Sequence, residues 1–542
     1  MAKSSKTRAS KQAYVSQNQL TLAGFETPFE NKLDPSNRWV KLAHQIPWDS
    51  IVNVYTNELS NQTTGASHIN ARVVLGCIII KHMCTLSDEE TLLQLQENMY
   101  MQYFIGYSSF SNQAPFDSSL FVEIRKRFGV DQLNAINDKI VELSQAKNNT
   151  TATEISPTDK EPKNPSSSQK QREDLIIDEN NKETPSKTHD GRLIVDATAC
   201  PQDIAYPTDL NLLNDAREKT QELIDVLYVK YLHKKKPRTY RKEARKAYLN
   251  TAMKRKKAKR EIRKALRKQL NYVKRNLGHI EKLHQCYAKG KTPLTEKEET
   301  YLVVIKELYR QQKAMFTEKT HSIEDRIVSI HQPHVRPIVR GKVKAKVEFG
   351  AKIQLSLVAG YAFLDVISWD AFNEGTKLLL AIENHKKRTG YYPVEVLADK
   401  IYCNRKNRKQ LKILGIRLLA KPLGRPSAMN TEHVSPGERN PIEGKFGQAK
   451  STYGLGRIKA RLADTSQSWI ASIILVLNLV KLAGQTLLSL IENLIRNLDV
   501  NPKLKNNMLL LFQQTLLIEN LFQISTYLVL YLNTQKCYDE SN

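Results

Sequence analysis

The chain lacks the cysteine patterns of disulfide-stabilised and zinc-binding proteins. Its six cysteines are scattered over 542 residues, with no CxxC pair and no Cys/His spacing typical of a zinc site. The N-terminal sequence MAKSSKTRASKQ is polar and basic, and it has no apolar core of the kind found in signal peptides. These absences predict reduced thiols and a cytoplasmic protein.

Long apolar runs and acidic residues are also scarce. The best candidate for a membrane span, residues 469–482, is interrupted by Asn478 and Lys481 and is shorter than the roughly 20 residues that a spanning helix needs. We therefore expect a soluble protein with no membrane partner. The chain has 83 Lys and Arg against 56 Asp and Glu, a net charge of +27. Such an excess indicates nucleic acid as the first candidate partner and an anionic membrane as the second.

The length exceeds that of one ordinary core and predicts roughly two to four domains. Residues 1–19 have the composition of a disordered basic tail, and residues 20–130 predict a compact helical domain. In that domain an apolar helix over 69–83 is followed by a capping box at Ser87 that opens a second helix through Gln96. The pair is either a DNA-reading helix-turn-helix or an ordinary helical hairpin, which is the commoner arrangement.

Composition separates this N-terminal module from the rest of the chain. Residues 146–190 are rich in Asn, Thr, Ser, Pro, Lys and Glu and predict a flexible linker. Residues 191–490 predict an α/β catalytic domain, and the apolar helical segment 491–542 has no assigned role.

Two aspartates follow predicted strands. Residues 193–195 predict a short buried strand with Asp196 at its carboxyl end, and residues 394–398 predict another that ends in Asp399. Asp196 could equally be a turn-capping aspartate. Residues 342–349, 352–358 and 361–368 predict antiparallel strands with glycines at the breaks, and residues 372–387 predict a helix. A helix over 404–414 and a strand over 416–420 complete a right-handed parallel unit.

A third carboxylate opens a later helix. Asn440 followed by Pro441 is typical of an N-cap and a first helical position, which places Glu443 in the first turn. Lys450 lies seven residues further on the same face, and Arg439 immediately precedes the helix. Asn440 and Glu443 also fit a capping box, which requires no function.

The three carboxylates can form a metal site. If the strands before Asp196 and Asp399 are parallel neighbours, their carboxylates meet at one sheet edge, and Glu443 can complete the group. Hard oxygen ligands that repel one another favour Mg²⁺ or Mn²⁺. Two such ions about 3.5–4 Å apart can activate a water or a 3′-hydroxyl and stabilise the leaving oxygen of a phosphoryl transfer. Pro333 predicts a loop around His331 and His334, which we do not assign to a metal site.

A basic helical insertion, residues 210–328, interrupts the predicted domain. Between Lys230 and Arg275 there are 21 Lys and Arg against two acids, with four tyrosines interleaved. A solvated helix face would mix the signs of its charges, so this block predicts a phosphate-binding surface with salt-dependent affinity. Its densest DNA-binding candidates are Lys254, Arg255, Lys256, Lys257 and Arg260.

Taken together, the motifs resemble bacterial insertion-sequence transposases of the DDE type, which share an RNase H-like, retroviral-integrase-like core. The resemblance covers most of residues 20–485. The stretches that carry it are Val195-Asp-Ala-Thr198, Pro201-Gln-Asp-Ile204, Tyr206-Pro-Thr-Asp209, Arg336-Pro-Ile-Val-Arg-Gly-Lys342, Glu348-Phe-Gly-Ala-Lys352, Ala398-Asp-Lys-Ile-Tyr402 with Asn404-Arg405, Arg439-Asn-Pro-Ile-Glu443 with Lys450, Tyr453-Gly-Leu455 and Ala460-Arg-Leu462.

The resemblance implies a fold, a reaction and a set of residues. The fold is an α/β RNase H-like core, a mixed sheet flanked by helices, with a helical N-terminal domain that recognises the transposon ends. The catalytic metal ligands are Asp196, Asp399 and Glu443, which in such enzymes hold two Mg²⁺ or Mn²⁺ ions. Arg439 and Lys450 hold DNA phosphates near the metals, and the motif after Asp399 adds the DNA-binding candidates Lys400 and Arg405.

The implied function is a DNA transposase that cleaves element ends and joins their 3′-hydroxyls to target DNA. Its partners are double-stranded DNA, both terminal inverted repeats and target, and a second copy of the chain in the synaptic complex; its location is the bacterial nucleoid. The chain departs from the family where Pro436 replaces a frequent tyrosine, and only 43 residues separate Asp399 from Glu443. The alternatives are an RNase H-fold nuclease, an inactive DNA-binding protein from a decayed element and, weakest, a polybasic membrane-surface protein.

Overall fold

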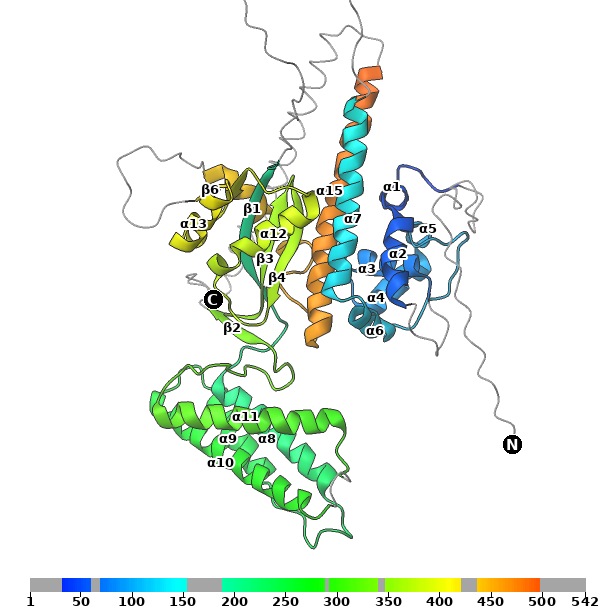
Figure 1. Cartoon of the computed structure of the whole chain (residues 1–542). Helices are drawn as coiled ribbons and strands as arrows, with labels where there is room; N and C mark the ends of the chain where they lie inside the picture. Colours follow the sequence, from blue (N-terminus) through cyan, green and yellow to red (C-terminus); the bar gives the residue numbers. More distant parts are fainter. Residues whose placement is uncertain are drawn as a thin grey trace, which may run out of the picture. The chain divides into compact units, whose positions relative to one another are not determined.

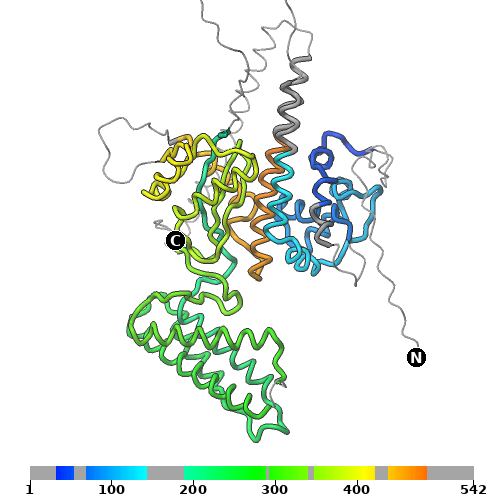
Figure 2. Tube along the Cα trace, in the orientation of Figure 1, coloured from blue at the N-terminus to red at the C-terminus, as the bar shows by residue number. Residues whose placement is uncertain are grey.

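The computed structural model describes residues 32–59, 69–153, 188–287, 292–339, 347–420 and 436–497. The chain divides into two units, residues 1–478 and 479–542, and the described part of the second is the end of one long helix. The predicted basic tail, residues 154–187 of the predicted linker and the C-terminal segment after 497 lie outside the described residues. Figure 2 shows the path of the chain.

A mixed sheet forms the centre of the first unit (Figure 1). Its strands are β1 (Arg192–Pro201), β2 (Arg336–Val339), β3 (Val347–Val358), β4 (Tyr361–Ser368), β5 (Glu395–Leu397) and β6 (Arg417–Leu419). The order β4-β3-β1-β5-β6 has β3 antiparallel to its neighbours and β1, β5 and β6 parallel, and β2 also pairs with β3. This sheet, flanked by helices, is consistent with an RNase H-like core.

The first strand is longer than the sequence predicts. β1 runs for ten residues and pairs with β3 from Leu193 to Pro201, so Asp196 lies within the strand and not at its end. Gly350, predicted as a break, is part of β3 opposite Pro201. A Cβ there would lie 2.0 Å from the Cys200 carbonyl oxygen, so glycine permits this close strand approach. Gly360, with φ +77°, forms the predicted turn between β3 and β4.

Helices cover the sheet. Leu193 and Val195 face a core formed with α12 (Leu378–Thr389) and α13 (Arg405–Ile413). The predicted helix over 372–387 begins later than expected, because Asn373 caps the 3₁₀ turn η3 (Glu374–Thr376) before α12. Two further 3₁₀ turns, η4 (Lys400–Tyr402) and η5 (Pro436–Arg439), precede α13 and α14 (Asn440–Ser451), and α15 (Ala463–Asn497) follows.

The insertion between β1 and β2 is helical, as predicted (green in Figure 1). Its helices are α8 (Asp209–Leu227), α9 (Arg241–Ala252), α10 (Lys259–His284) and α11 (Glu296–Glu318). The apolar faces of α8, α10 and α11 form a core of their own, separate from that of the sheet. The insertion therefore supports its own basic surface without using the interior of the α/β domain.

The N-terminal module is helical, and the predicted cap is confirmed: Ser87 Oγ accepts a hydrogen bond from the Glu90 N–H at 3.0 Å. α3 is buried over almost its whole length, so it is the central helix of the module. Asp88 binds both Lys81, at 2.9 Å, and Arg125, at 2.8 Å. The helices are α1 (Arg38–Gln45), α2 (Trp48–Leu59), α3 (Ala71–Met83), α4 (Asp88–Glu97), α5 (Met99–Phe104), α6 (Leu120–Arg127) and α7 (Val130–Thr153).

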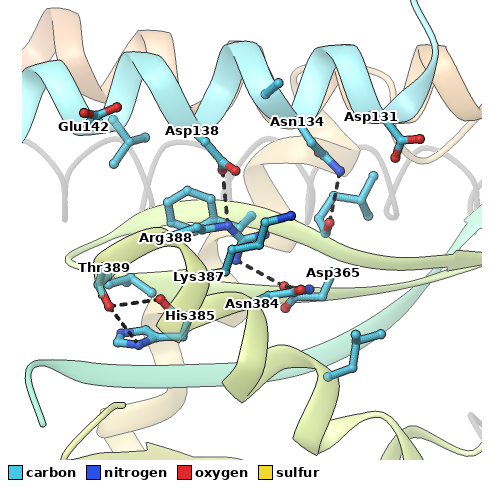
Figure 3. A pocket seen from close by; sticks show the side chains of 16 residues that line it. Asp131, Asn134, Asp138, Glu142, Asp365, Asn384, His385, Lys387, Arg388 and Thr389 are labelled. Atoms are coloured by element: carbon cyan, nitrogen blue, oxygen red, sulfur yellow. Dashed lines mark hydrogen bonds and ion pairs between the residues drawn. The ribbon is translucent and has the colours of Figure 1, made fainter. Parts of the chain in front are cut away.

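α7 joins this module to the sheet. It continues through Thr153, so the first residues of the predicted linker are helical. Asn137 donates to the Ala362 carbonyl at 3.1 Å, and the Asn478 amide bonds both the N–H and the C=O of Ala362, at 2.8 and 2.7 Å. On the same side Arg388 bridges Asp138 of α7 and the buried Asp365 of β4 (Figure 3). These contacts cover an edge strand whose backbone would otherwise be unpaired.

α15 is the helix in which the sequence shows its best membrane candidate. Over Ala463–Gly484, 22 residues, it is long and apolar enough to cross a membrane by length and composition, so the expectation that this segment is too short is wrong. Of its apolar 18-residue window, 67% is buried in the protein. Within the first unit its Trp469 packs edge-on against His82, with ring centres 4.9 Å apart, and lies under the Lys81 ammonium. The core helix of a soluble protein has the same composition, and these contacts favour that interpretation.

The Asn478 bonds make a stability prediction. Asn478→Ala leaves the Ala362 N–H without its side-chain acceptor, whereas the Ala362 carbonyl keeps the bond from Asn137, so we expect the free energy of unfolding to fall by about 1–3 kcal/mol. The measurement is thermal unfolding of the full chain. Asn134→Ala, which removes one longer bond of 3.3 Å to the Leu364 carbonyl, is the matched control and should have a smaller effect. Equal melting temperatures for wild type and Asn478→Ala would refute the role.

Candidate active site

The register of β1 and β5 brings two carboxylates together. Ile194 is paired with Leu397 in the parallel ladder, and the same register continued by two residues places Asp196 beside Asp399. Because successive strand residues point to opposite faces, Asp196 faces away from the core that contains Val195. The two strands are thus parallel neighbours, as the sequence predicts.

All three predicted carboxylates surround one guanidinium group. Arg439 Nη2 lies 3.2 Å from Asp196 Oδ2 and 4.0 Å from Glu443 Oε1. Its Nη1 lies 3.3 Å from Asp399 Oδ1. The carboxylates come from β1, from the turn after β5 and from α14, which are far apart in the sequence. The structure therefore brings Asp196, Asp399, Glu443 and Arg439 together in one group.

The start of α14 differs from the expected one. Arg439, with φ −92° and ψ −12°, occupies the cap position and makes no side-chain capping bond, because η5 winds directly into α14. The prediction of Asn440 as the N-cap is therefore wrong, and so is the capping box between Asn440 and Glu443. Glu443 has 61% of its side chain exposed, so helix capping does not explain this carboxylate.

Burial makes the Asp196 carboxyl a weaker acid than usual. Desolvation raises the pKa of its carboxyl from 3.8 to about 6. The Ala197 N–H, which donates to Oδ1 at 2.8 Å, and the Arg439 guanidinium oppose this rise, whereas the negative charges of Glu374 and Asp399 add to it. The side chain is only 16% exposed. Asp196 therefore carries its charge where water is scarce, whereas Asp399 and Glu443 are exposed.

Sequence reasoning missed Glu374. Its carboxylate binds Lys352 Nζ at 2.8 Å, and its charge acts on Asp196. The turn that carries it is fixed to the segment after Asp399, because Asn407 donates to the Gly375 carbonyl at 2.8 Å. A Cβ on Gly375 would lie 2.6 Å from the Ile401 carbonyl oxygen, so this contact requires a glycine. The sequence carries no clear signal for Glu374, because these contacts form between distant segments.

The group fits a hard divalent ion in its donor chemistry. The three carboxylates offer the oxygen ligands that Mg²⁺ and Mn²⁺ prefer, and they already share one positive charge. As they stand, no three His, Cys, Asp or Glu side chains of the described residues are arranged to hold a metal ion. The guanidinium lies among the oxygens that a metal ion would bind.

Basic side chains flank this group. Lys400 and Arg405 are exposed, directly after Asp399 and at the start of α13, and Lys450 is half-buried on α14. Sequence reasoning did not single out the rest of the exposed basic side of α13, although the run of bases is visible in the sequence: Lys406, Arg408, Lys409 and Lys412.

The predicted basic residues of the insertion are all exposed. Lys254, Arg255, Lys256 and Lys257 lie between α9 and α10, and Arg260 lies in the first turn of α10. Lys254 pairs with Glu261 at 2.8 Å. α10 buries its apolar face and exposes further bases on the opposite one: Arg263, Lys264, Arg267 and Lys268.

Other candidates for a functional site have structural partners. His331 contacts the Tyr301 hydroxyl at 2.9 Å, and His334 packs edge-on against Trp369 with ring centres 4.3 Å apart. Burial lowers the pKa of His334 to about 4. A cavity of about 630 Å³ lies where α7, β4 and α12 meet, and none of the three carboxylates lines it (Figure 3).

Two family matches agree with this geometry. Residues 27–127 match the family described as "Transposase domain (DUF772)", and residues 396–480 match the "Transposase DDE domain". The second match contains Asp399 and Glu443, whereas Asp196 precedes it. Both matches support an insertion-sequence transposase of the DDE type. For such a transposase DNA is the partner, and the family generally uses divalent metal ions.

One curated relative is similar to part of the chain. It is the "Uncharacterized protein ORF8 in nfe locus" of Rhizobium meliloti, 32% identical over 120 residues. The matched segment is 21% of this chain and 57% of the relative, so the chain spans little more than half the length of that protein. No solved structure matches the chain.

The pKa of Asp196 predicts how stability depends on pH. Because the folded-state pKa, about 6, exceeds the ordinary 3.8, the folded state binds the proton more tightly. The resulting stabilisation, about 3 kcal/mol, is complete below pH 4 and is lost as the pH rises through 6. Asp196→Asn should remove this dependence. Denaturant unfolding in EDTA from pH 4 to 7 measures it, and parallel pH profiles for the two proteins would contradict the assignment.

Proposed function

We propose that this chain is a DNA transposase that cleaves insertion-sequence ends and joins their 3′-hydroxyls to target DNA. In this proposal the sheet and its helices are an RNase H-like catalytic core, and Asp196, Asp399 and Glu443 are the metal ligands. The observation that carries it is the convergence of these carboxylates, from three separate elements, on the Arg439 guanidinium.

The role of each residue follows from its position. Asp196 is held by the β1 ladder, and Asp399 is oriented by the Lys400 N–H, which donates to its Oδ1 at 2.7 Å. Glu443 is exposed and can adjust to substrate. When bound, one or two divalent ions would activate the attacking water or hydroxyl and stabilise the leaving oxygen. Burial around Asp196 excludes water and so strengthens the electrostatic interactions inside the site.

Cations on neighbouring elements would hold the DNA. Lys400 and Arg405 follow Asp399, and Lys450 lies two turns after Glu443 on α14. Their charges suit the phosphates on either side of the reacting bond, which they would position without reading sequence. Arg439 would also bind a DNA phosphate when its side chain can reach one.

The insertion and the N-terminal module supply the remaining DNA contacts in this proposal. The exposed bases of 254–268 would bind phosphates over a wider stretch of duplex, and the module would recognise the terminal inverted repeats. Since two ends must be brought together, we also propose a homodimer in the synaptic complex, acting in the cytoplasm on nucleoid DNA. An RNase H-fold nuclease and an inactive DNA-binding protein are the rival functions.

A joining assay tests the function. Purified protein is incubated with Mg²⁺, supercoiled target and a duplex with the element's terminal sequence. We expect covalent joining by the wild type, and neither cleavage nor joining by Asp399→Asn or Glu443→Ala, although both variants should still bind DNA. Asp370→Asn, which changes an exposed acid outside the group, is the matched control and should stay active.

The same assay separates the rival functions. If the wild type cleaves DNA without joining it, and Glu443→Ala does not cleave, the protein is a nuclease with the same site and not a transposase. Binding with neither activity would indicate a DNA-binding protein with an unused site. If Asp399→Asn cleaves DNA as the wild type does, the three carboxylates are not the catalytic site.

The basic loop between α9 and α10, with Lys254, Arg255, Lys256 and Lys257, leads to a prediction about how DNA affinity depends on salt concentration. The triple variant Arg255→Gln, Lys256→Gln and Lys257→Gln should weaken DNA binding and reduce the slope of log K against log salt concentration by about 1–3, since each lost phosphate contact contributes about 0.9. The control removes the same charge from α11, where acids and bases alternate: Lys297, Lys306 and Lys313 to Gln. Equal slopes for the two triple variants would show that the loop has no special part in binding.

A further inference from the structure

Arg439 contacts all three carboxylates, and its single positive charge offsets part of their negative charge. Its two terminal nitrogens lie within 3.2–4.0 Å of one oxygen from each of Asp196, Asp399 and Glu443. Lys352 lies nearby, and its ammonium is engaged by Glu374 and by the Phe372 carbonyl. Among the ion pairs of the described residues, the one cation that contacts all three carboxylates is Arg439.

A guanidinium and a divalent ion cannot share this position. A metal ion needs the carboxylate oxygens at about 2.0–2.2 Å, so it would bind among the same oxygens that Arg439 now contacts. At such separations the two positive charges repel strongly, and little water is available to screen them near Asp196. One cation must leave when the other binds.

The fit of Arg439 is also incomplete. Its Nε is buried and has no hydrogen-bond partner among the residues that the structure describes. The contact with Glu443 is long, at 4.0 Å, and the Glu443 side chain is mostly exposed. Here the cost of releasing the side chain is lowered by the bonds that it does not make.

We propose that Arg439 is an internal counter-ion of the three carboxylates, which a divalent metal ion displaces so that the guanidinium becomes available to a DNA phosphate. The inference rests on the proposed function, because it takes these carboxylates as the metal site. It adds an order to that function: the guanidinium lies among the carboxylate oxygens before metal binds, and metal binding prepares a phosphate contact beside the reacting bond. Premature metal binding is opposed by the protein's own charge.

The test is Mn²⁺ binding by the EDTA-treated full chain without DNA, followed by the electron paramagnetic resonance signal of free Mn²⁺. Arg439→Gln removes the charge and keeps a polar side chain, so we expect it to bind Mn²⁺ at least about tenfold more tightly than the wild type. Asp399→Asn should bind more weakly in either background. Arg439→Lys keeps the charge but cannot bridge three carboxylates, so it should bind Mn²⁺ more tightly than wild type by a smaller factor.

Thermal unfolding supplies a second readout that does not depend on activity. Without metal, Arg439→Gln should melt at a lower temperature than wild type, because the carboxylates repel one another. Addition of Mn²⁺ should raise its melting temperature by more than it raises that of the wild type. If Arg439→Gln does not fold, the lysine variant carries both measurements.

The outcomes separate this inference from the function on which it rests. If Asp399→Asn weakens Mn²⁺ binding but neither Arg439 variant tightens it, the metal site stands and the counter-ion role is overturned. If Asp399→Asn leaves Mn²⁺ binding unchanged in every background, the ion binds elsewhere, and the proposed active site fails together with the inference.

Discussion

The parallel pairing of β1 with β5 is the constraint on which the site depends. Three paired residues on each strand fix the register, and that register carries Asp196 to the side of Asp399. β3 holds the remainder of β1 in place over nine residue pairs, including the close approach at Gly350. A shift of one residue would turn Asp196 into the apolar core and Val195 out of it. The chemistry therefore rests on backbone register before it rests on any side chain.

The insertion is attached at the end of β1 that lies away from its pairing with β5. It leaves from the end of β1 and returns through β2, which pairs with β3, so both of its connections are strands of the same sheet. Its independent core keeps the helices folded without displacing Asp196. The basic side chains of this surface repel one another. The helices that carry them stay folded because they bury an apolar face in their own core. The acidic site and the basic surface remain parts of one fold.

The sequence predicts what short segments determine. Asp399 after a buried strand, a helix that begins near Asn404, Ser87 as the cap of α4 and the helical insertion are local patterns, and the structure contains them. The full extent of β1 and the position of Gly350 depend on a partner strand about 150 residues away, so periodicity alone could not predict them. The predicted start of α14 was wrong, because the preceding turn continues into the helix and Asn440 is therefore not the cap.

The parts that the sequence missed are contacts between distant charges. Glu374 beside Asp196 and Asn478 on Ala362 join segments that no motif connects. The same physics explains why Arg439 lies where it does. In a chain of net charge +27, a group of three carboxylates, of which Asp196 is mostly buried, attracts a nearby cation. Arg439, four residues before Glu443, takes that place until a more highly charged ion competes for it, so this arginine can offset part of the site's charge and later bind the substrate.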